Sequence, residues 1–205
     1  MRGLCEVGIV IASIVAMKYI FNKTIQDVVE ITPFIHHDYR GEYVETWNEQ
    51  VYDIIPIVLK TKIKWVQDDV STSVKHTLRG LHGDSKTWKL IQCLYGSILV
   101  TVVDMRKNSP SYLKWIQIPI NDKNRTQVLI PAGCANGHLV MSEFGIFSYK
   151  QSEYYSGAEN QFTIRWDDPA LDITWPISNP ILSERDKSAK LLELKDTVTA
   201  FLPNE

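Results

Sequence analysis

Short runs of β-branched and aromatic residues alternate with turn-forming residues along most of the chain. From residue 24 onward they recur at a spacing of roughly 8–12 residues, which is typical of a β-sandwich or barrel. The predicted strands cover residues 27–32, 42–47, 63–68, 89–95, 97–104, 114–120, 126–131, 138–142, 145–150 and 161–166. The segments between them are rich in Gly, Pro, Asn, Asp and Ser, which are the residues that turns require.

Two of the predicted strands indicate how the sheets are buried. Every second residue from Ile116 to Ile120 is isoleucine, so one face of that strand is apolar. Residues 97–103 (SILVTVV) are apolar on both faces, as in a central strand between two layers. Clear helical periodicity occurs only in residues 188–202. We therefore predict an all-β cupin or jelly-roll double-stranded β-barrel with a short C-terminal helix, and a small-molecule site at the barrel mouth.

An apolar run over residues 7–17 sets the N-terminal segment apart. As a helix this run would span about 16 Å, which is far less than a hydrocarbon core of roughly 30 Å. A signal peptide needs several basic residues ahead of the run, and only Arg2 precedes it. We interpret residues 1–22 as an N-terminal extension, either an appended strand or a leader. A weak membrane anchor, a cleaved signal and translation from Met17 stay open. Residues 23–205 are the predicted cupin domain.

Composition excludes several function classes. The 205 residues have a formal net charge of −2 with both signs well represented, which argues against a nucleic-acid-binding surface. The three cysteines, Cys5, Cys93 and Cys134, lie far apart and form no CxxC pair. A disulfide scaffold and a thiolate zinc site are therefore not expected, and a reducing, cytoplasmic compartment is the default.

The common catalytic motifs are missing from the sequence. The five histidines form no HxH pair, so no metal site is predicted, and a metal-dependent cupin oxygenase lacks its ligand set. Neither a phosphate-binding glycine loop nor a GxSxG nucleophile elbow occurs. Instead, polar residues such as His82, Lys89 and Tyr149 lie in or beside predicted strands. Each of them alone is unspecific, because such residues are commonly exposed or structural.

Ten short motifs, taken together, are more specific. They are DYRGEYVE (38–45), WVQDDxSxS (65–73), LRGLH (78–82), KL (89–90), VDxRxxSPSY (103–112), IPAG (130–133), YxxxxYY (149–155), WDDP (166–169), WP (175–176) and LSERD (182–186). In this order they resemble the dTDP-4-dehydrorhamnose 3,5-epimerase family over residues 24–190. The resemblance implies a cupin-fold homodimer that needs neither a metal nor an organic cofactor and acts on a nucleotide-diphosphate 4-keto sugar.

The resemblance also implies a role for each catalytic candidate, and the chemistry is consistent with it. His82 would remove a proton from carbon, because imidazole ionises near neutral pH. Asp186 would hold the imidazole in one tautomer. Lys89 would stabilise the oxyanion that develops at C4. Tyr149 would return a proton to the opposite face of the sugar, which completes the inversion.

Asp186 has a competing interpretation. The sequence Ser183-Glu184-Arg185-Asp186 precedes the predicted helix, so the carboxylate would equally suit a helix-capping box.

The substrate contacts implied by the resemblance fall into two groups. Guanidinium groups, which suit diphosphates, come from Arg40 and Arg79. Aromatic and polar side chains would hold the nucleotide base, namely Tyr43, Tyr154, Glu45 and Gln67.

Three departures from the family pattern bear on the substrate. The family has F/Y-Q after the motif histidine, whereas this chain has Gly83-Asp84 and a shortened loop before Lys89. The family's Q-D-N becomes Q-D-D at residues 67–69. The family's A-H-G-F becomes A-N-G-H, so Asn136 replaces a second histidine while His138 appears two residues later. If this segment is a strand, both side chains point to the same side, and both are candidate substrate contacts.

Gly83-Asp84 with its shortened loop, together with the A-N-G-H segment at 135–138, makes the chain similar to the branch of the family that acts on 4-keto heptoses of bacterial capsules. Those sugars are usually carried on GDP, and some members of the branch invert only one carbon. Two functions stay open. The leading hypothesis is an epimerase that inverts C3, C5 or both in a dTDP- or GDP-linked 4-keto-6-deoxyhexose or 4-keto-heptose, for cell-surface polysaccharides. The alternative is a non-catalytic cupin that binds nucleotide sugars.

Overall fold

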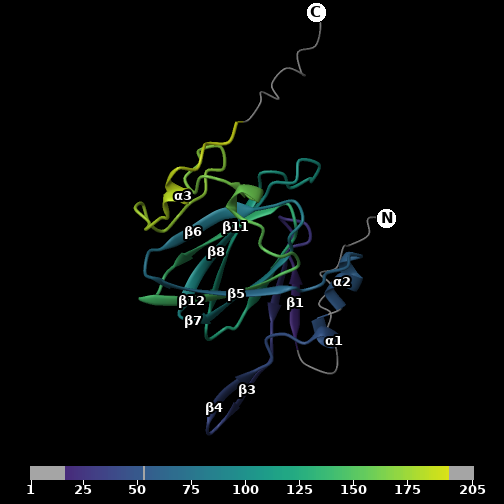
Figure 1. Ribbon diagram of the computed structural model, residues 1–205. Coiled ribbons are helices and arrows are strands. Elements are labelled where there is room, and N and C mark those ends of the chain that lie inside the picture. The colour runs from purple at the N-terminus through teal and green to yellow at the C-terminus, as the bar shows by residue number, and fades with distance from the viewer. Residues whose placement is uncertain (1–16, 53, 194–205) are drawn as a thin grey trace, which may run out of the picture.

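The computed structural model describes residues 17–52 and 54–193, which form two facing β-sheets and a projecting hairpin (Figure 1). The six-stranded sheet contains, in spatial order, β1 (Lys18–Phe21), β2 (Val29–Thr32), β10 (Gln127–Ile130), β7 (Lys89–Tyr95), β12 (Phe144–Gln151) and β5 (Gln67–Val74). The five-stranded sheet contains β13 (Phe162–Thr163), β6 (Leu78–Gly83), β11 (Cys134–Val140), β8 (Ser97–Asp104) and β9 (Trp115–Asn121). The hairpin consists of β3 (Ile35–Asp38) and β4 (Gly41–Val44).

Helices contribute little to the described fold. They are α1 (Glu49–Tyr52), α2 (Ile54–Leu59), the 3₁₀ turn η1 (Ala158–Asn160) and α3 (Glu184–Lys187). No helix among the residues that the structure describes is long and apolar enough to cross a membrane.

The principal core lies between the two sheets. Val100 and Val102 of β8 meet Ile91 of β7 and Phe147 of β12, and all of these side chains are buried. Burial of each such side chain stabilises the fold by about 1.5–3 kcal/mol. The arrangement confirms the prediction that the strand over residues 97–104 is central, because both of its faces are covered.

Two further clusters cover the outer faces of the sheets. Leu90 and Leu129 of the six-stranded sheet pack with Tyr52 and Ile55, next to α1 and α2. On the other sheet, Leu81, Val103 and Ala135 pack with Ile164 and Leu171 of the C-terminal segment. The two central strands of the five-stranded sheet, β8 and β11, are therefore largely buried on both sides.

Several strands begin and end close to the predicted positions. Strands β7 and β8 have the predicted bounds, 89–95 and 97–104. Strands β9, β10 and β12 differ from the prediction by one residue at either end. In these segments the apolar residues face the core, which is why the hydrophobic pattern located them.

Other strands were predicted wrongly or missed. Strand β5 begins at Gln67, whereas the predicted strand began at residue 63. The apolar pattern did not locate β5, because its inward face carries polar side chains at every second position. Strand β6 was missed because polar residues and two glycines interrupt its apolar pattern. Edge strand β1 and hairpin strand β3 were also missed. All four lie at sheet edges or next to the edge strand β13, where the apolar signal is weak.

The N-terminal segment contributes one strand to the six-stranded sheet. Within the predicted extension over residues 1–22, β1 pairs in register with β2, and Tyr19 is buried. The six-stranded sheet therefore begins at Lys18. Residues 1–16, which contain most of the apolar run, lie outside the described residues.

The predicted C-terminal helix does not begin at residue 188. Residues 188–193 are not helical, and 194–202 lie outside the described residues. A tertiary contact explains the difference, since the backbone N–H of Leu192 donates to the Asp168 carboxylate at 2.6 Å instead of to a helical carbonyl. The helix that does occur, α3, comes earlier and is capped by Ser183, whose hydroxyl oxygen accepts from the N–H of Asp186.

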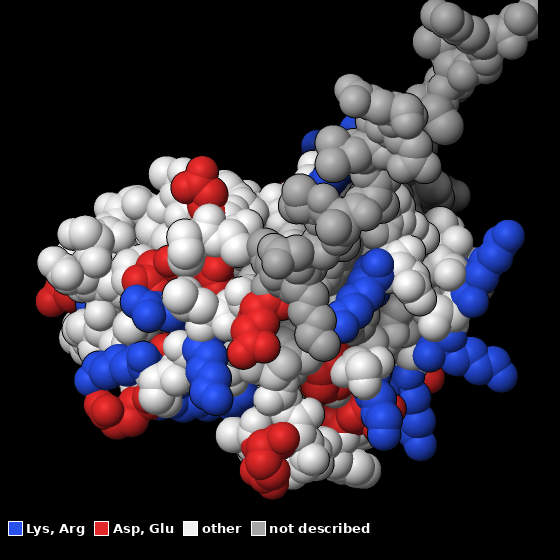
Figure 2. All heavy atoms as spheres, turned by 90° about the horizontal axis from the view of Figure 1, so that it is seen from above, with Lys and Arg blue, Asp and Glu red and all other residues white. Residues whose placement is uncertain are grey.

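The charged residues are mixed on the surface. On the face shown in Figure 2, Lys and Arg side chains are interspersed with Asp and Glu.

Two glycines allow β6 and β11 to approach closely, at the position where the ladder shifts register between Asn136 and His138. A Cβ on Gly137 would lie 2.7 Å from the carbonyl oxygen of Arg79 and 3.2 Å from the Cα of Gly80. Both neighbours are backbone atoms, so neither is able to rotate away.

We predict that Gly137→Ala lowers the free energy of unfolding by about 1–3 kcal/mol, because the added methyl group overpacks the backbone. Chemical denaturation measures this change. The matched control is Gly145→Ala, whose Cβ meets only methyl groups of Val140 and Ile98 at 3.0 Å or more and should cost less. Equal losses in the two variants would contradict the proposed close approach.

Candidate active site

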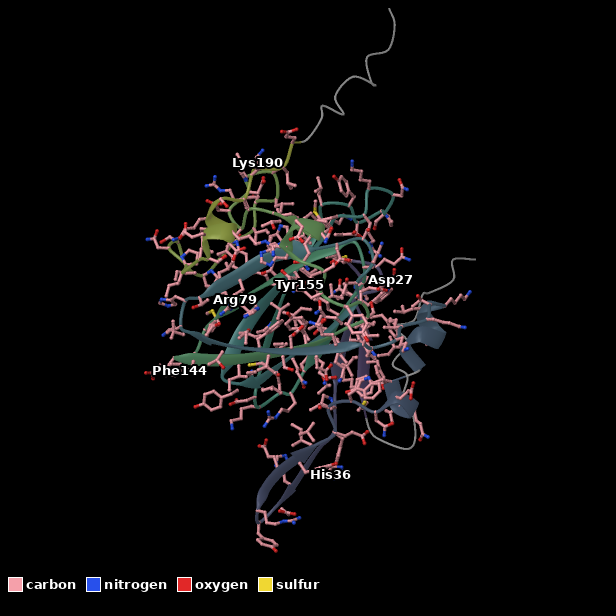
Figure 3. All side chains as sticks on the ribbon, viewed as in Figure 1. Asp27, His36, Arg79, Phe144, Tyr155 and Lys190 are labelled. Carbon is pink, nitrogen blue, oxygen red and sulfur yellow. The ribbon has the colours of Figure 1, made fainter. Side chains whose placement is uncertain are left out.

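A cavity of about 290 Å³ lies between the sheets and is lined by residues of β5, β6, β7, β11 and β12 and by the start of α3. Arg79 and Tyr155 both line it and mark its place in Figure 3. The cavity has charged and polar walls, in contrast to the apolar core beside it. This is the kind of site expected at a cupin barrel mouth.

His82 and Asp186 form a hydrogen-bonded pair on the wall that belongs to the five-stranded sheet. His82 lies in β6, and its Nε2 is 2.5 Å from Oδ1 of Asp186, a residue that is 3% exposed. Burial by itself would raise the pKa of Asp186, but the hydrogen bonds from His82 and Ser183 hold it below its ordinary value. An ionised carboxylate only accepts, so Nε2 carries a hydrogen, and in the neutral imidazole Nδ1 then keeps a free lone pair.

Asp186 contacts the helix cap as well as His82. Its backbone N–H donates to the Ser183 hydroxyl at the start of α3, and that hydroxyl donates to Oδ2 at 2.9 Å. The other carboxylate oxygen, Oδ1, remains for His82. The helix cap thus fixes the orientation of the carboxylate that in turn orients the imidazole.

Lys89 extends toward the same place from the six-stranded sheet. It is the first residue of β7, is 8% exposed, and donates from Nζ to Oδ1 of Asn136 at 3.0 Å. Asn136 is paired with His82 in the β6–β11 ladder, so the ammonium lies beside the His82–Asp186 pair. Burial lowers the pKa of Lys89 to about 8, which the Asp84 carboxylate opposes and the Arg185 guanidinium reinforces.

Tyr149 also lies on the wall formed by the six-stranded sheet. In β12 it is paired with Ile91 of β7 on one side and with Asp69 of β5 on the other. Burial raises the pKa of Tyr149 to about 12, and the Asp69 carboxylate acts in the same direction. The phenol is therefore protonated at working pH. Tyr149 and His82 thus line the cavity from different sheets.

His138 and Arg79 lie further along the cavity. His138 is 3% exposed and stacks on Phe147 with ring centroids 4.0 Å apart and an interplanar angle of 16°. Burial lowers the pKa of His138 to about 3, and the Arg79 guanidinium adds to this shift, so the imidazole is neutral. As their spacing predicted, Asn136 and His138 both line the cavity. Arg79 donates from Nε to the Ser73 hydroxyl at 2.9 Å.

Three predicted substrate contacts lie away from this cavity. Arg40 and Tyr43 are on the β3–β4 hairpin, which projects from the sheets beside the labelled His36 (Figures 1 and 3). Arg40 pairs with Asp38 at 2.6 Å, and Tyr43 is 68% exposed. Glu45 accepts a hydrogen bond from Asn48. Within one chain the structure does not bring these residues to the catalytic candidates.

Gln67 and Tyr154 lie near the cavity without lining it. Gln67 accepts from the backbone N–H of Tyr155 at 2.8 Å and donates to the Asp69 carboxylate. Tyr154 lines a second, polar hollow of about 450 Å³. Tyr155 lines both spaces, so the second hollow adjoins the cavity.

Several residues in the cavity wall were not singled out from the sequence. They are Asp69, Ser71, Gln151, Tyr155 and Arg185. A signal existed for the first two, because polar residues at every second position of 67–73 mark one face of a strand. Arg185 adjoins Asp186, but nothing in the sequence places its guanidinium near Lys89.

No group of three or more His, Cys, Asp or Glu side chains in residues 17–52 and 54–193 is placed to hold a metal ion.

Comparisons with known proteins agree with this geometry. The family profile described as dTDP-4-dehydrorhamnose 3,5-epimerase matches residues 22–194. The dTDP-4-dehydrorhamnose 3,5-epimerase of Salmonella typhimurium is 36% identical over 181 residues, which cover 86% of this chain and 97% of that protein.

Solved structures give the same assignment. The dTDP-6-deoxy-D-glucose-3,5-epimerase of Legionella pneumophila, in complex with dTDP-4-keto-L-rhamnose, is 36% identical with a TM-score of 0.80, over 88% of this chain and 95% of that one. The dTDP-4-dehydrorhamnose 3,5-epimerase of Bacillus anthracis, with TDP and PPi bound, is 35% identical with a TM-score of 0.79, over 86% and 100%. This cupin-fold chain therefore belongs to the dTDP-4-dehydrorhamnose 3,5-epimerase family and is a sugar epimerase.

Proposed function

We propose that this enzyme inverts C3, C5 or both carbons of a nucleotide-diphosphate 4-keto sugar through an enolate. The observation that carries the proposal is the arrangement of groups around one cavity. The His82–Asp186 pair comes from the side of the five-stranded sheet, and Lys89 and Tyr149 come from the facing sheet.

The reaction follows from the acidity of the substrate. A C4 ketone acidifies the protons on its neighbouring carbons, and the free Nδ1 of His82 accepts one of them while Asp186 stabilises the imidazolium. Negative charge moves to the C4 oxygen, where the Lys89 ammonium stabilises the enolate more than the ketone. Tyr149, held protonated, donates a proton to the opposite face of the carbon. Exchange of both groups with solvent restores the starting protonation.

Asn136 takes part by orienting Lys89. In this chain the amide oxygen at position 136 accepts from Nζ, so the replacement of the family's histidine leaves the ammonium held in place. An intact acid, base and buried cation favour catalysis over the alternative of a binding protein without activity. Asn136 is on this account a positioning residue for the cation.

The adjoining hollow suits the nucleotide. It is polar, continues from the cavity past Tyr155, and is lined by the exposed ring of Tyr154, on which a base would stack. Arg79, which lines the cavity, would bind the diphosphate. Relatives bind dTDP sugars or TDP, and the departures in this sequence make GDP-linked sugars the second group to test.

The cellular setting is part of the same proposal. Cys93 and Cys134 are buried free thiols, which is consistent with a reducing cytoplasm. There the enzyme would supply sugars for cell-surface polysaccharides.

We infer that the working unit is a homodimer in which the β3–β4 hairpin of one chain completes the site of the other. The hairpin carries Arg40 and Tyr43 away from its own cavity and exposes Phe34, Tyr39 and Tyr43. Exposed aromatic side chains that are grouped on one projection are typical of an interaction surface. A second copy would bring Arg40 and Tyr43 to a nucleotide.

The primary test is hydrogen exchange in D₂O with dTDP- and GDP-linked 4-keto sugars, followed by NMR. We expect deuterium to enter C3, C5 or both, and His82→Ala to slow this exchange by about 10²- to 10⁴-fold, the usual worth of a positioned base. Tyr149→Phe is the matched variant, because it should impair inversion while the enolate still forms and exchange persists. Absence of exchange with every sugar would contradict the proposed activity.

The pH dependence of kcat/KM tests Lys89. Only the protonated amine stabilises the enolate, and its pKa is about 8, so on the alkaline side of the profile activity should fall as the pH rises through that value. Lys89→Arg keeps a charge at all working pH values, so the alkaline decline should vanish even if the rate is lower. A decline that persists unchanged in Lys89→Arg would mean that another group titrates.

Mixed dimers test the inferred assembly. If the hairpin acts in trans, mixing inactive His82→Ala with an inactive Arg40→Ala/Tyr43→Ala variant gives hybrids with one intact site, and activity returns to about a quarter of the native value. Mixing His82→Ala with Asp186→Ala is the control, since no intact site forms. No recovery in the first mixture, with dimers present by sedimentation, would place the hairpin outside the site.

A further inference from the structure

One departure from the family pattern lies directly beside the proposed acid. The third residue of the family's Q-D-N is asparagine, whereas this chain has Asp69. Asp69 of β5 is paired with Tyr149 of β12, and both side chains line the cavity. Residues directly opposite each other in an antiparallel pair have Cβ atoms about 4.5–5.5 Å apart, so their side chains interact. The departure therefore puts a carboxylate beside the phenol in place of a neutral amide.

Two glutamine side chains hold this carboxylate. Gln67 and Gln151 are paired in the same ladder, and each donates from Nε2 to Oδ2 of Asp69 at 2.8 Å. Gln151 is 3% exposed, so its amide is enclosed by the sheet. Amide N–H groups suit an ionised carboxylate, which only accepts hydrogen bonds. Asp69 is thus an anion at a fixed place in the cavity wall.

The charged groups around Tyr149 do not act on it equally. Burial and the Asp69 carboxylate raise the pKa of Tyr149 to about 12. The Tyr155 hydroxyl adds to this shift, and the Arg79 guanidinium opposes it. The other ionisable groups that line the cavity are His82, Lys89, His138, Arg185 and Asp186. Tyr149 therefore holds its proton more tightly than burial alone would require.

The enolate of the proposed reaction has two outcomes, and only one of them leaves a charge on Tyr149. In the return, the His82 imidazolium gives its proton back to the carbon, and the charges of both groups disappear. In the inversion, a proton passes from the Tyr149 phenol to the opposite face of the carbon, the C4 ketone forms again, and a tyrosinate remains. Negative charge thereby leaves the oxygen beside Lys89 and appears on the oxygen beside Asp69. Because like charges repel at short range, Asp69 opposes inversion and does not oppose return.

We propose that Asp69 sets the ratio of inversion to return in this enzyme, because its carboxylate disfavours the tyrosinate that inversion leaves behind. The inference rests on the proposed epimerase function and concerns the same site. Asp69 acts through Tyr149 and is a positioning residue, since it exchanges no proton with the sugar. Loss of its charge would direct more of the enolate to the inverted product.

The test compares Asp69→Asn with the native enzyme in D₂O. This substitution removes the charge, preserves the size of the side chain and keeps an oxygen for the glutamine amides. NMR follows deuterium in the starting sugar and formation of the inverted sugar in the same sample. We expect the ratio of inversion to exchange to rise by about 3- to 10-fold, because loss of the repulsion makes Tyr149 a better proton donor to carbon. An unchanged or lower ratio would overturn the inference.

Two further variants assign the effect to the charge at position 69. Asp68→Asn removes the neighbouring carboxylate, which lies on the exposed face of β5 and pairs with Lys150, and the ratio should not change. Asp69→Glu retains the charge, so its ratio should lie closer to the native value than to that of Asp69→Asn. A rise in the ratio with Asp68→Asn, or an equal rise with Asp69→Glu, would contradict a role for this charge.

A double variant shows whether Asp69 acts through the phenol. Without Tyr149 only the return is available to the enolate, so in the Tyr149→Phe background Asp69→Asn should leave the rate of deuterium exchange unchanged. A faster or slower exchange in the double variant would place the action of Asp69 on another group.

Titration of the phenol distinguishes failure of this inference from failure of the proposed function. NMR of ¹³C-labelled tyrosine, assigned with Tyr149→Phe, needs no substrate. Asp69→Asn should lower the pKa of Tyr149 from about 12, and Asp68→Asn should not. An unchanged pKa, or exchange with an unchanged ratio, removes the role of Asp69 and retains the epimerase. No exchange with any sugar removes the epimerase proposal and this inference with it.

Discussion

The hydrogen bond between His82 and Asp186 is the contact on which the site depends. It joins two residues 104 positions apart and ties the segment that begins α3 to the barrel strand β6. The Ser183 cap holds the carboxylate, the carboxylate holds the imidazole, and the imidazole is thereby left with its free nitrogen for chemistry. One side chain thus contacts both the helix cap and the proposed catalytic base, because a carboxylate has two oxygens.

The two facing sheets place side chains on opposite sides of the cavity, as inversion at a sugar carbon requires. A carbon that loses a proton on one face and gains it on the other needs two groups on opposite sides, and the two proposed groups, His82 and Tyr149, line the cavity from separate sheets. The polar inward face of β5 and the buried Lys89 oppose stability, since such groups lose hydration on folding. The apolar clusters on both faces of both sheets offset that cost and keep the walls of the cavity rigid.

Burial sets the charge states of the ionisable groups in the cavity. Burial shifts the pKa of Lys89 to about 8, that of His138 to about 3 and that of Tyr149 to about 12, so near neutral pH a cation, a neutral imidazole and a neutral phenol share one space. In the proposed reaction the Lys89 ammonium is the cation that meets the developing oxyanion, while the neutral phenol of Tyr149 keeps a proton to donate.

The sequence by itself determined the sheet-rich class, the central strands over 89–95 and 97–104, and, through its ordered motifs, the family and the catalytic candidates around His82 and Lys89. Only the tertiary structure decided the rest. Strands β5 and β6 were misplaced or missed because they line a cavity, where polar and glycine positions replace the apolar period. Residues 188–193 leave the helical pattern because Asp168 captures a backbone N–H of Leu192. His138 stacks on Phe147 from a strand of the other sheet, and a contact across a barrel interior has no local signature in a sequence.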